Sequence, residues 1–102
     1  MAKYYITRKA AEDLSSIWEY TLKTWSESQA DIYYHELKKT FEGIVERPTF
    51  YDREYIEIKP GLYGRRCKKH IVFYKLAGGG DIEIIRILHE RMDIECRLAD
   101  QT

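Results

Sequence analysis

The sequence predicts an α+β fold in which an N-terminal strand and a two-helix hairpin pack on an antiparallel β-sheet. Two apolar stripes at helical spacing fill the first half of the chain, and short β-rich segments with a glycine turn fill the second half. The 102 residues, of which 44% are hydrophobic, suit one domain over 1–102 with a single core.

The chain opens with a short segment rich in β-formers, Lys3–Ile6, which predicts a strand. Thr7 is a suitable N-cap for a helix that starts directly after it. Apolar residues then recur at helical spacing: Ala11, Leu14, Ile17, Trp18, Leu22 and Trp25. These features predict a strand followed at once by the first helix.

A second helix follows after a very short turn. Ser26 and Gln29 have the spacing of a capping box, and Arg47–Pro48 marks the end of the helix. Its apolar stripe is Ala30, Tyr33, Leu37, Phe41 and Ile44. Because the connection is so short, the two helices must form an antiparallel or steeply crossed hairpin, whose shared apolar face needs a sheet to cover.

The rest of the chain supplies the strands of that sheet. We expect strands at Tyr55–Ile58, Leu62–Lys69, His70–Leu76 and Ile82–His89. Pro60–Gly61 predicts a turn, and Gly78–Gly80 predicts the tip of a hairpin. The segment Met92–Leu98 is compatible with a short helix or a terminal strand. The predicted order of the main elements is β-α-α-β-β-β.

Charge is distributed unevenly along the chain. The formal net charge is zero, which argues against a protein that coats nucleic acid over its whole surface. Between Lys59 and Leu76, however, there is no acid among six cations: Lys59, Arg65, Arg66, Lys68, Lys69 and Lys75. Lysines on an edge strand can simply block aggregation. Six cations exceed that need, so the pattern favours a local surface for a polyanion or an acidic protein.

Arg86 and His89, near the end of the last predicted strand, are the candidates for catalysis. With Arg65 or Arg66 they could stabilise a phosphorane and protonate a leaving oxygen, as RNA cleavage requires. No spacing identifies the general base for that reaction. A histidine at a strand end is also a common structural hydrogen-bonding group, so the pattern does not require an enzyme.

Other candidate sites are weaker. The cysteines Cys67 and Cys96 and the histidines lack metal-ligand spacing, so we expect no metal and no cofactor. The two cysteines are expected to be reduced, because no export signal or membrane span is apparent and a cytoplasmic location follows. The aromatic group Trp18, Trp25, Tyr33 and Tyr34 is interpreted as core and inter-helix packing, with a partner groove as the alternative.

Several of these segments resemble one protein family. The segments Ala11–Leu14, Ile17–Tyr20 and Trp25–Tyr33 resemble the helical hairpin of the ParE toxins. Lys59–Tyr63 and His70–Tyr74 resemble the middle strands of that family, and Arg86–Asp93 is similar to its closing signature. The resemblance covers nearly the whole chain, in order.

The resemblance implies a fold of the RelE/ParE type and membership of a bacterial type II toxin–antitoxin system. It implies growth inhibition through DNA gyrase without catalysis by the toxin, plasmid stabilisation as a role, and a ParD-like antitoxin that wraps around the toxin in a hetero-oligomer. It implies no membrane partner and no stable binding of nucleic acid by the toxin alone. The alternative is the RelE branch, whose members cut mRNA on the ribosome.

The candidate residues follow from these readings. We expect the target-binding surface to contain Arg65, Arg66, Lys68, Lys69, Arg86, His89 and Arg91. We expect the antitoxin to contact Trp18, Trp25 and Tyr33. If the chain were instead a ribonuclease, the catalytic residues would be Arg65, Arg86 and His89.

Overall fold

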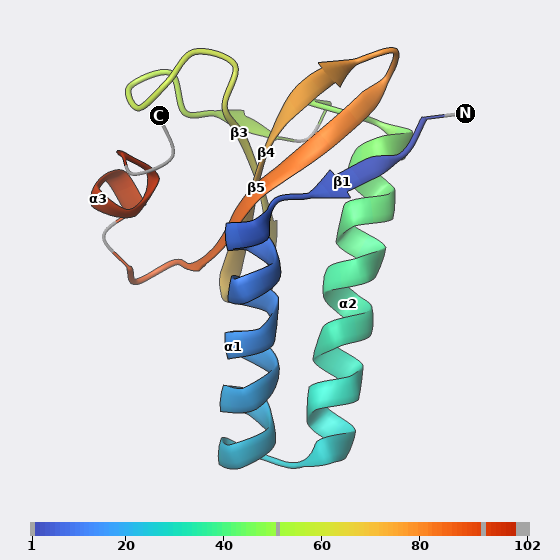
Figure 1. Ribbon diagram of the computed structural model, residues 1–102, viewed down its shortest axis with the longest axis vertical. Coiled ribbons are helices and arrows are strands. Elements are labelled where there is room, and N and C mark those ends of the chain that lie inside the picture. Colours follow the sequence, from blue (N-terminus) through green and yellow to red (C-terminus); the bar gives the residue numbers. More distant parts are fainter. Residues whose placement is uncertain (1, 51, 93, 100–102) are drawn as a thin grey trace.

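Two long helices lie side by side against one face of a five-stranded sheet (Figure 1). The structure, a computed structural model, describes residues 2–50, 52–92 and 94–99. The elements are β1 (Tyr4–Ile6), α1 (Arg8–Thr24), α2 (Glu27–Glu46), β2 (Arg53–Glu54), β3 (Tyr63–Cys67), β4 (His70–Gly78), β5 (Asp81–His89) and α3 (Ile94–Ala99). In the described part of the chain, no helix is long and apolar enough to span a bilayer.

The strand order in the sheet is β1-β5-β4-β3-β2. Strands β2 to β5 pair antiparallel with their neighbours, whereas β1 pairs parallel with β5. A parallel pair needs a long connection, which the helical hairpin and the three intervening strands provide. The predicted α+β fold is confirmed, and the parallel first strand makes the sheet mixed.

Both long helices begin where the sequence indicates. The Thr7 hydroxyl accepts a hydrogen bond from the amide of Ala10 at 3.1 Å, and the Ser26 hydroxyl accepts one from the amide of Gln29 at 3.1 Å. Each cap satisfies one of the amides that a helix leaves unpaired in its first turn. α2 ends at Glu46, one residue before the predicted Arg47–Pro48 boundary.

The main core lies between the helices and the sheet. Its buried members are Ala10, Leu37, Phe41, Ile44, Cys67, Val72, Tyr74, Ile82, Ile84 and Ile87. Burying each large side chain contributes about 1.5–3 kcal/mol, so this cluster is the chief source of stability. Cys67 has a free, buried thiol whose pKa is raised by burial. The expectation that both cysteines are reduced is confirmed for Cys67; the side chain of Cys96 lies outside the described residues.

A second, smaller core covers the opposite face of the sheet. It contains Leu62, Ile71, Phe73, Leu88 and Leu98, with Tyr55, Ile58, Ile85 and Ile94 packed against it. For Met92–Leu98 the sequence was compatible with a helix or a strand. The structure has a helix there, α3, whose Ile94 and Leu98 pack into this second core (Figure 1). A Cβ at Gly64 would lie 2.7 Å from Cε2 of Tyr55, so glycine is required where this ring crosses the sheet.

The strand predicted at Tyr55–Ile58 is wrong. The carbonyl of Tyr55 accepts hydrogen bonds from the amides of Ile58 and Lys59, each at 3.0 Å, which closes a turn. Tyr55 and Ile58 pack into the same cluster, as residues three apart do in a helical turn and alternating strand residues do not. The pairing strand is β2, which lies just before this turn and pairs with Tyr63 and Gly64.

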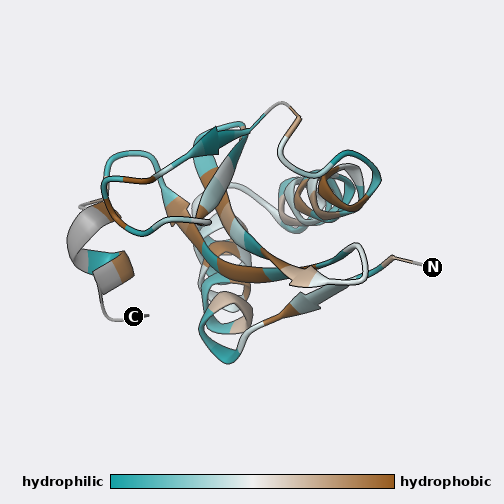
Figure 2. Ribbon diagram, turned by 90° about the horizontal axis from the view of Figure 1, so that it is seen from above, coloured by the Kyte–Doolittle hydropathy of each residue, from teal (hydrophilic) through white to brown (hydrophobic). Residues whose placement is uncertain are grey.

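The two hairpins of the sheet differ in how well they were predicted. Gly79 and Gly80 have φ of 61° and 84° and form the predicted tight turn between β4 and β5. The strand expected to reach Lys69 stops at Cys67, because Lys68 and Lys69 form the turn to β4. Figure 2 shows the apolar strands enclosed between the helices and the segment before β3.

Candidate interaction surfaces

Cationic side chains gather at the end of the sheet where β3 turns into β4. Cys67 pairs with His70 across the turn, so Lys68 and Lys69 project from its tip, and both are exposed. The end of β5 lies alongside, because the amide of Glu90 donates to the carbonyl of Lys69 at 2.9 Å. We call Arg66, Lys68, Lys69, His89 and Arg91 the cationic end.

The backbone of this turn is left-handed at Lys68, as it is at Thr49 after α2. Lys68 has a φ of 56°, a left-handed conformation that glycine, asparagine and aspartate adopt more readily than lysine. Arg66 is partly neutralised, since its Nη2 lies 2.7 Å from a carboxylate oxygen of Glu90, and their side chains are 65% and 28% exposed. The net charge of this end therefore comes mainly from Lys68, Lys69 and Arg91.

Three rings link α2 to this end of the sheet. The Tyr33 hydroxyl is hydrogen-bonded to Nδ1 of His70, and the ring of His70 lies edge-on to that of His89 with centroids 5.2 Å apart. Burial, followed by the proximity of His89, lowers the pKa of His70 to about 4. Burial raises the pKa of Tyr33 to about 12. Both groups are neutral at pH 7, so neither is poised for proton transfer.

The depressed pKa of His70 predicts a pH-dependent stability. Unfolded His70 binds a proton below about pH 6.5, whereas the folded protein binds it only near pH 4. The free energy of unfolding should therefore be fully present above pH 6.5 and fall as pH drops towards 4. Urea denaturation between pH 7.5 and 4.5 should show this slope, and His70→Gln should flatten it.

The matched control is His35→Gln, because His35 is exposed on α2. An unchanged slope in His70→Gln, or an equal change in His35→Gln, would contradict the assignment of this pH dependence to His70.

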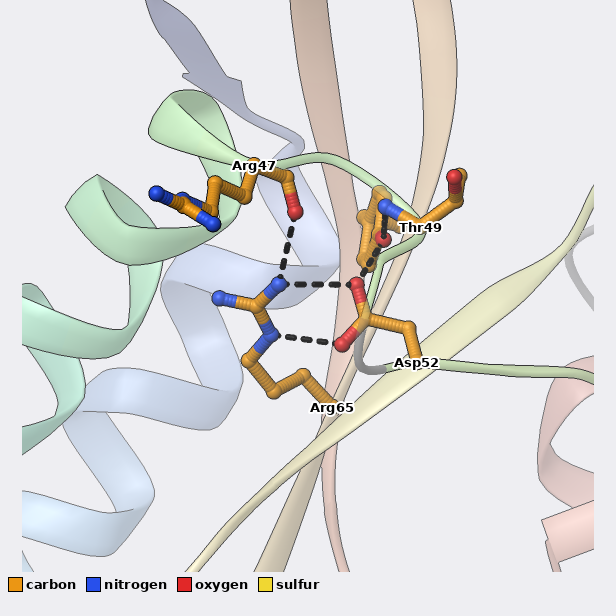
Figure 3. A network of polar contacts seen from close by, with 5 residues as sticks. Arg47, Thr49, Asp52 and Arg65 are labelled. Atoms are coloured by element: carbon orange, nitrogen blue, oxygen red, sulfur yellow. Dashed lines mark hydrogen bonds and ion pairs between the residues drawn. The ribbon is translucent and has the colours of Figure 1, made fainter.

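Arg65 lies in a network beneath the sheet surface and not on it (Figure 3). Its Nε donates to Asp52 at 2.5 Å and its Nη2 donates to the same carboxylate at 3.1 Å and to the carbonyl of Arg47 at 2.9 Å. The Tyr74 hydroxyl donates to Asp52 and accepts from the amide of Thr49 at 2.8 Å. The network ties the end of α2 and the following segment to β3 and β4.

Arg86 is also engaged inside the protein. Its guanidinium donates twice to Asp13 of α1, at 2.7 and 2.9 Å, and the residue is 8% exposed. Asp13 also accepts from the amide of Ile87 at 3.0 Å. β1 pairs with β5 only from Ile82 to Ile84. Beyond that point, the Asp13 carboxylate supplies a hydrogen-bond acceptor for the edge of β5, at the amide of Ile87. Neither arginine presents its guanidinium on the surface, contrary to the expectation for Arg65 and Arg86.

The candidate residues thus separate into two groups. The structure brings Arg66, Lys68, Lys69, His89 and Arg91 together at one end. Sequence analysis missed the two acids that hold Arg65 and Arg86, Asp52 and Asp13. The available signal was the alternation of β3, which places Arg65 on the same face as the buried Cys67 and therefore requires a partner for its charge.

The outer part of the helical hairpin exposes aromatic and aliphatic side chains. Trp25 is 72% exposed, so interpreting it as core is wrong, whereas Tyr34 is 45% exposed but takes part in the expected inter-helix packing. Trp18 is half-buried and lies edge-on to Tyr34, with ring centroids 6.3 Å apart. Tyr33 faces His70 with its ring and also lines a small inter-helix pocket with Trp18 and Tyr34. Trp25 and Tyr34 are therefore accessible to a partner.

Comparison with known proteins places the chain in a family. Residues 4–94 match the family model for the ParE toxin of the type II toxin–antitoxin system parDE. Toxin ParE1 of Caulobacter vibrioides is 37% identical over 100 residues, covering 96% of this chain and 99% of the relative. Toxin ParE of Escherichia coli is 34% identical over 103 residues, covering 99% and 97%.

Solved structures agree on the fold. A structure described as the chromosomal ParDE toxin–antitoxin system from P. aeruginosa superimposes with a TM-score of 0.71 at 19% identity, covering 87% of this chain and 96% of the other. A YoeB–YefM complex from Staphylococcus aureus gives a TM-score of 0.61 at 14% identity, covering 87% and 97%. The fold and the near full-length relatives lead to one conclusion: the chain belongs to the ParE toxin family of type II toxin–antitoxin systems.

Proposed function

We propose that this chain inhibits DNA gyrase by binding it, without catalysis of its own, and that a ParD-like antitoxin neutralises it. The observation that carries the proposal is the match of residues 4–94 to the ParE toxin model, together with relatives named ParE over nearly the whole chain. Inhibition by binding requires an accessible surface and no reactive group, and the cationic end meets that requirement.

The geometry of the candidate catalytic residues favours binding over chemistry. Arg65 and Arg86 are each held by a carboxylate of the fold, at Asp52 and Asp13. An arginine that stabilises a transition state must instead aim its donors at the position where charge develops. His89 accepts a hydrogen bond at Nδ1 from the amide of Arg91 at 3.1 Å, as a structural histidine does.

We assign the target-binding surface to the cationic end. Arg66, Lys68, Lys69, His89 and Arg91 lie there, while Arg65 and Arg86 support the strands behind them. The left-handed conformation of Lys68 supports this assignment, because strained backbone is often retained where it positions a functional side chain. The proposed contact is with an acidic or phosphate-rich part of the gyrase–DNA complex.

Reversing the charge of the turn should reduce toxicity. In Lys68→Asp/Lys69→Glu, aspartate suits the left-handed position, so the fold should be unchanged. Two lost contacts of about 1 kcal/mol each would weaken target binding about 30-fold. Growth of cells at graded induction, with equal amounts of folded protein, measures the effect.

The control is Lys23→Glu/Lys39→Glu, which changes the net charge equally on exposed positions of α1 and α2. Full toxicity of the turn variant, or equal loss in the control, would remove the cationic end from the target-binding surface.

The outer hairpin is the proposed contact for the antitoxin. Trp18 and Trp25 lie there, with Tyr34 between the helices, and an amphipathic segment could cover them. Tyr33, the third residue expected to bind the antitoxin, is half-buried beside Trp18 and Tyr34, and its hydroxyl is bonded to His70. Hydrogen exchange of the complex should show protection of the last turn of α1, and an unprotected last turn would exclude this contact.

A further inference from the structure

A groove of about 420 Å³ opens on the sheet away from the cationic end. One wall is the Lys59–Leu62 loop, and Lys75–Leu76 of β4 forms another part of the lining. Tyr63 of β3, Glu83 and Ile85 of β5, and Thr7, the cap of α1, also line it. Leu62 and Ile85 also belong to the second core, so the groove is on the face opposite α1 and α2.

The lining combines apolar surface with a small excess of positive charge. Ile85 is half-buried and packs against the second core, so it supplies apolar surface to this lining. Lys75 Nζ lies 3.3 Å from Glu83, and both side chains remain accessible, at 52% and 37%. Among the described residues Lys59 forms no ion pair. Two lysines and one glutamate therefore line the groove, which favours an occupant with apolar and acidic side chains.

The neighbouring sheet edge favours a polypeptide as that occupant. Glu83 pairs with Tyr5 of β1, and β1 is the last strand of the sheet on this side. Tyr5 and Ile6 are 48% and 38% exposed. A terminal strand offers backbone donors and acceptors that an extended segment can pair with. A segment leaving the groove past Glu83 would reach this edge.

We propose that this groove binds an acidic, amphipathic segment of the antitoxin. The inference rests on the proposed toxin–antitoxin function and names the surface, the charge and the contacts through which part of that function acts. Lys75 in the groove and His70 at the cationic end are five residues apart on β4, about 17 Å. The groove and the target-binding surface are therefore separate, and changes in the groove should release the toxin from neutralisation without reducing its toxicity.

The test uses the purified chain and the antitoxin encoded by the adjacent reading frame. Binding is measured by calorimetry for the wild type, for Lys59→Glu/Lys75→Glu and for the control Lys38→Glu/Lys39→Glu, whose two exposed positions lie on α2 and outside the last turn of α1. The groove variant should bind roughly tenfold more weakly or worse, with a smaller salt dependence, while the control binds as the wild type does. Overlapping peptides that tile the antitoxin should identify an acidic, amphipathic one that competes for the groove.

Two further measurements keep the outcome clear. Hydrogen exchange of the wild-type complex should protect Leu62 and the Lys75–Leu76 segment, whatever the stability of the variants. In cells, the groove variant should inhibit growth as the wild type does but should need more antitoxin for rescue. Equal affinity of the groove variant and no protection at the groove would overturn the inference. A wild-type chain that binds no antitoxin at all would overturn the proposed function as well.

Discussion

Asp52→Ala should cost about 3–5 kcal/mol of the free energy of unfolding, a large part of the 5–15 kcal/mol expected for a domain of this kind. The Asp52 side chain is fully buried and that of Arg65 is 16% exposed. Removing the carboxylate leaves a covered guanidinium without its counter-charge and the Tyr74 hydroxyl without its acceptor. The segment after α2 would lose its attachment to β3 and β4 (Figure 3).

Urea denaturation of wild type and variant measures this loss directly. The matched control is Glu57→Ala, because Glu57 forms an ion pair with Arg53 at 2.7 Å on the exposed surface. Solvent screens that pair, so its loss should move the urea midpoint little. Similar midpoints for Asp52→Ala and Glu57→Ala would show that the buried network does not stabilise the fold.

Asp13→Ala should have an effect of similar size, about 3–5 kcal/mol. The change removes the acceptor for both donors of Arg86 and for the amide of Ile87. Arg86 loses the two hydrogen bonds and the counter-charge that Asp13 provides, and the amide of Ile87 at the edge of β5 loses its acceptor. The control is Glu12→Ala on the same helix. Nε of Arg8 lies 3.5 Å from a carboxylate oxygen of Glu12, and the two side chains are 93% and 62% exposed, so solvent screens this ion pair.

A double variant separates support of the fold from catalysis. Asp13→Leu/Arg86→Met replaces the buried pair with apolar groups and should recover much of the stability lost in Asp13→Ala. If Arg86 only supports the fold, this variant inhibits growth as the wild type does. Loss of toxicity in a double variant that is fully folded would assign Arg86 to the target or to the chemistry of a ribonuclease.

The helical half of the fold was predictable because its signals are local. Thr7 and Ser26 are side-chain caps, and the apolar stripes report directly on the buried faces of α1 and α2. The glycine hairpin was predictable for the same reason, since two residues with positive φ require Gly79 and Gly80. The parallel pairing of β1 with β5 joins residues nearly eighty positions apart, and no local pattern specifies it.

The positions of the arginines were not predictable from composition. Six cations without an acid between Lys59 and Leu76 suggested one continuous surface. Two of the arginines assigned to a surface have their partners far away in sequence, at Asp52 for Arg65 and at Asp13 for Arg86. The cations of the proposed target-binding surface that remain exposed are Arg66, Lys68, Lys69 and Arg91, while Lys59 and Lys75 are exposed at the groove. The buried ion pair with Asp52 thus separates Arg65 from the exposed cations of its sequence cluster, and the pair with Asp13 removes Arg86 from the expected surface.

The most direct test of the proposed function is a gyrase assay with the purified chain, freed of its antitoxin. The account predicts loss of supercoiling or accumulation of linearised plasmid, with a weaker effect for Lys68→Asp/Lys69→Glu and full activity for Lys23→Glu/Lys39→Glu. Folded, growth-inhibiting protein that leaves gyrase unaffected while translated mRNA is cut would contradict it, and would move the assignment to the ribonuclease branch.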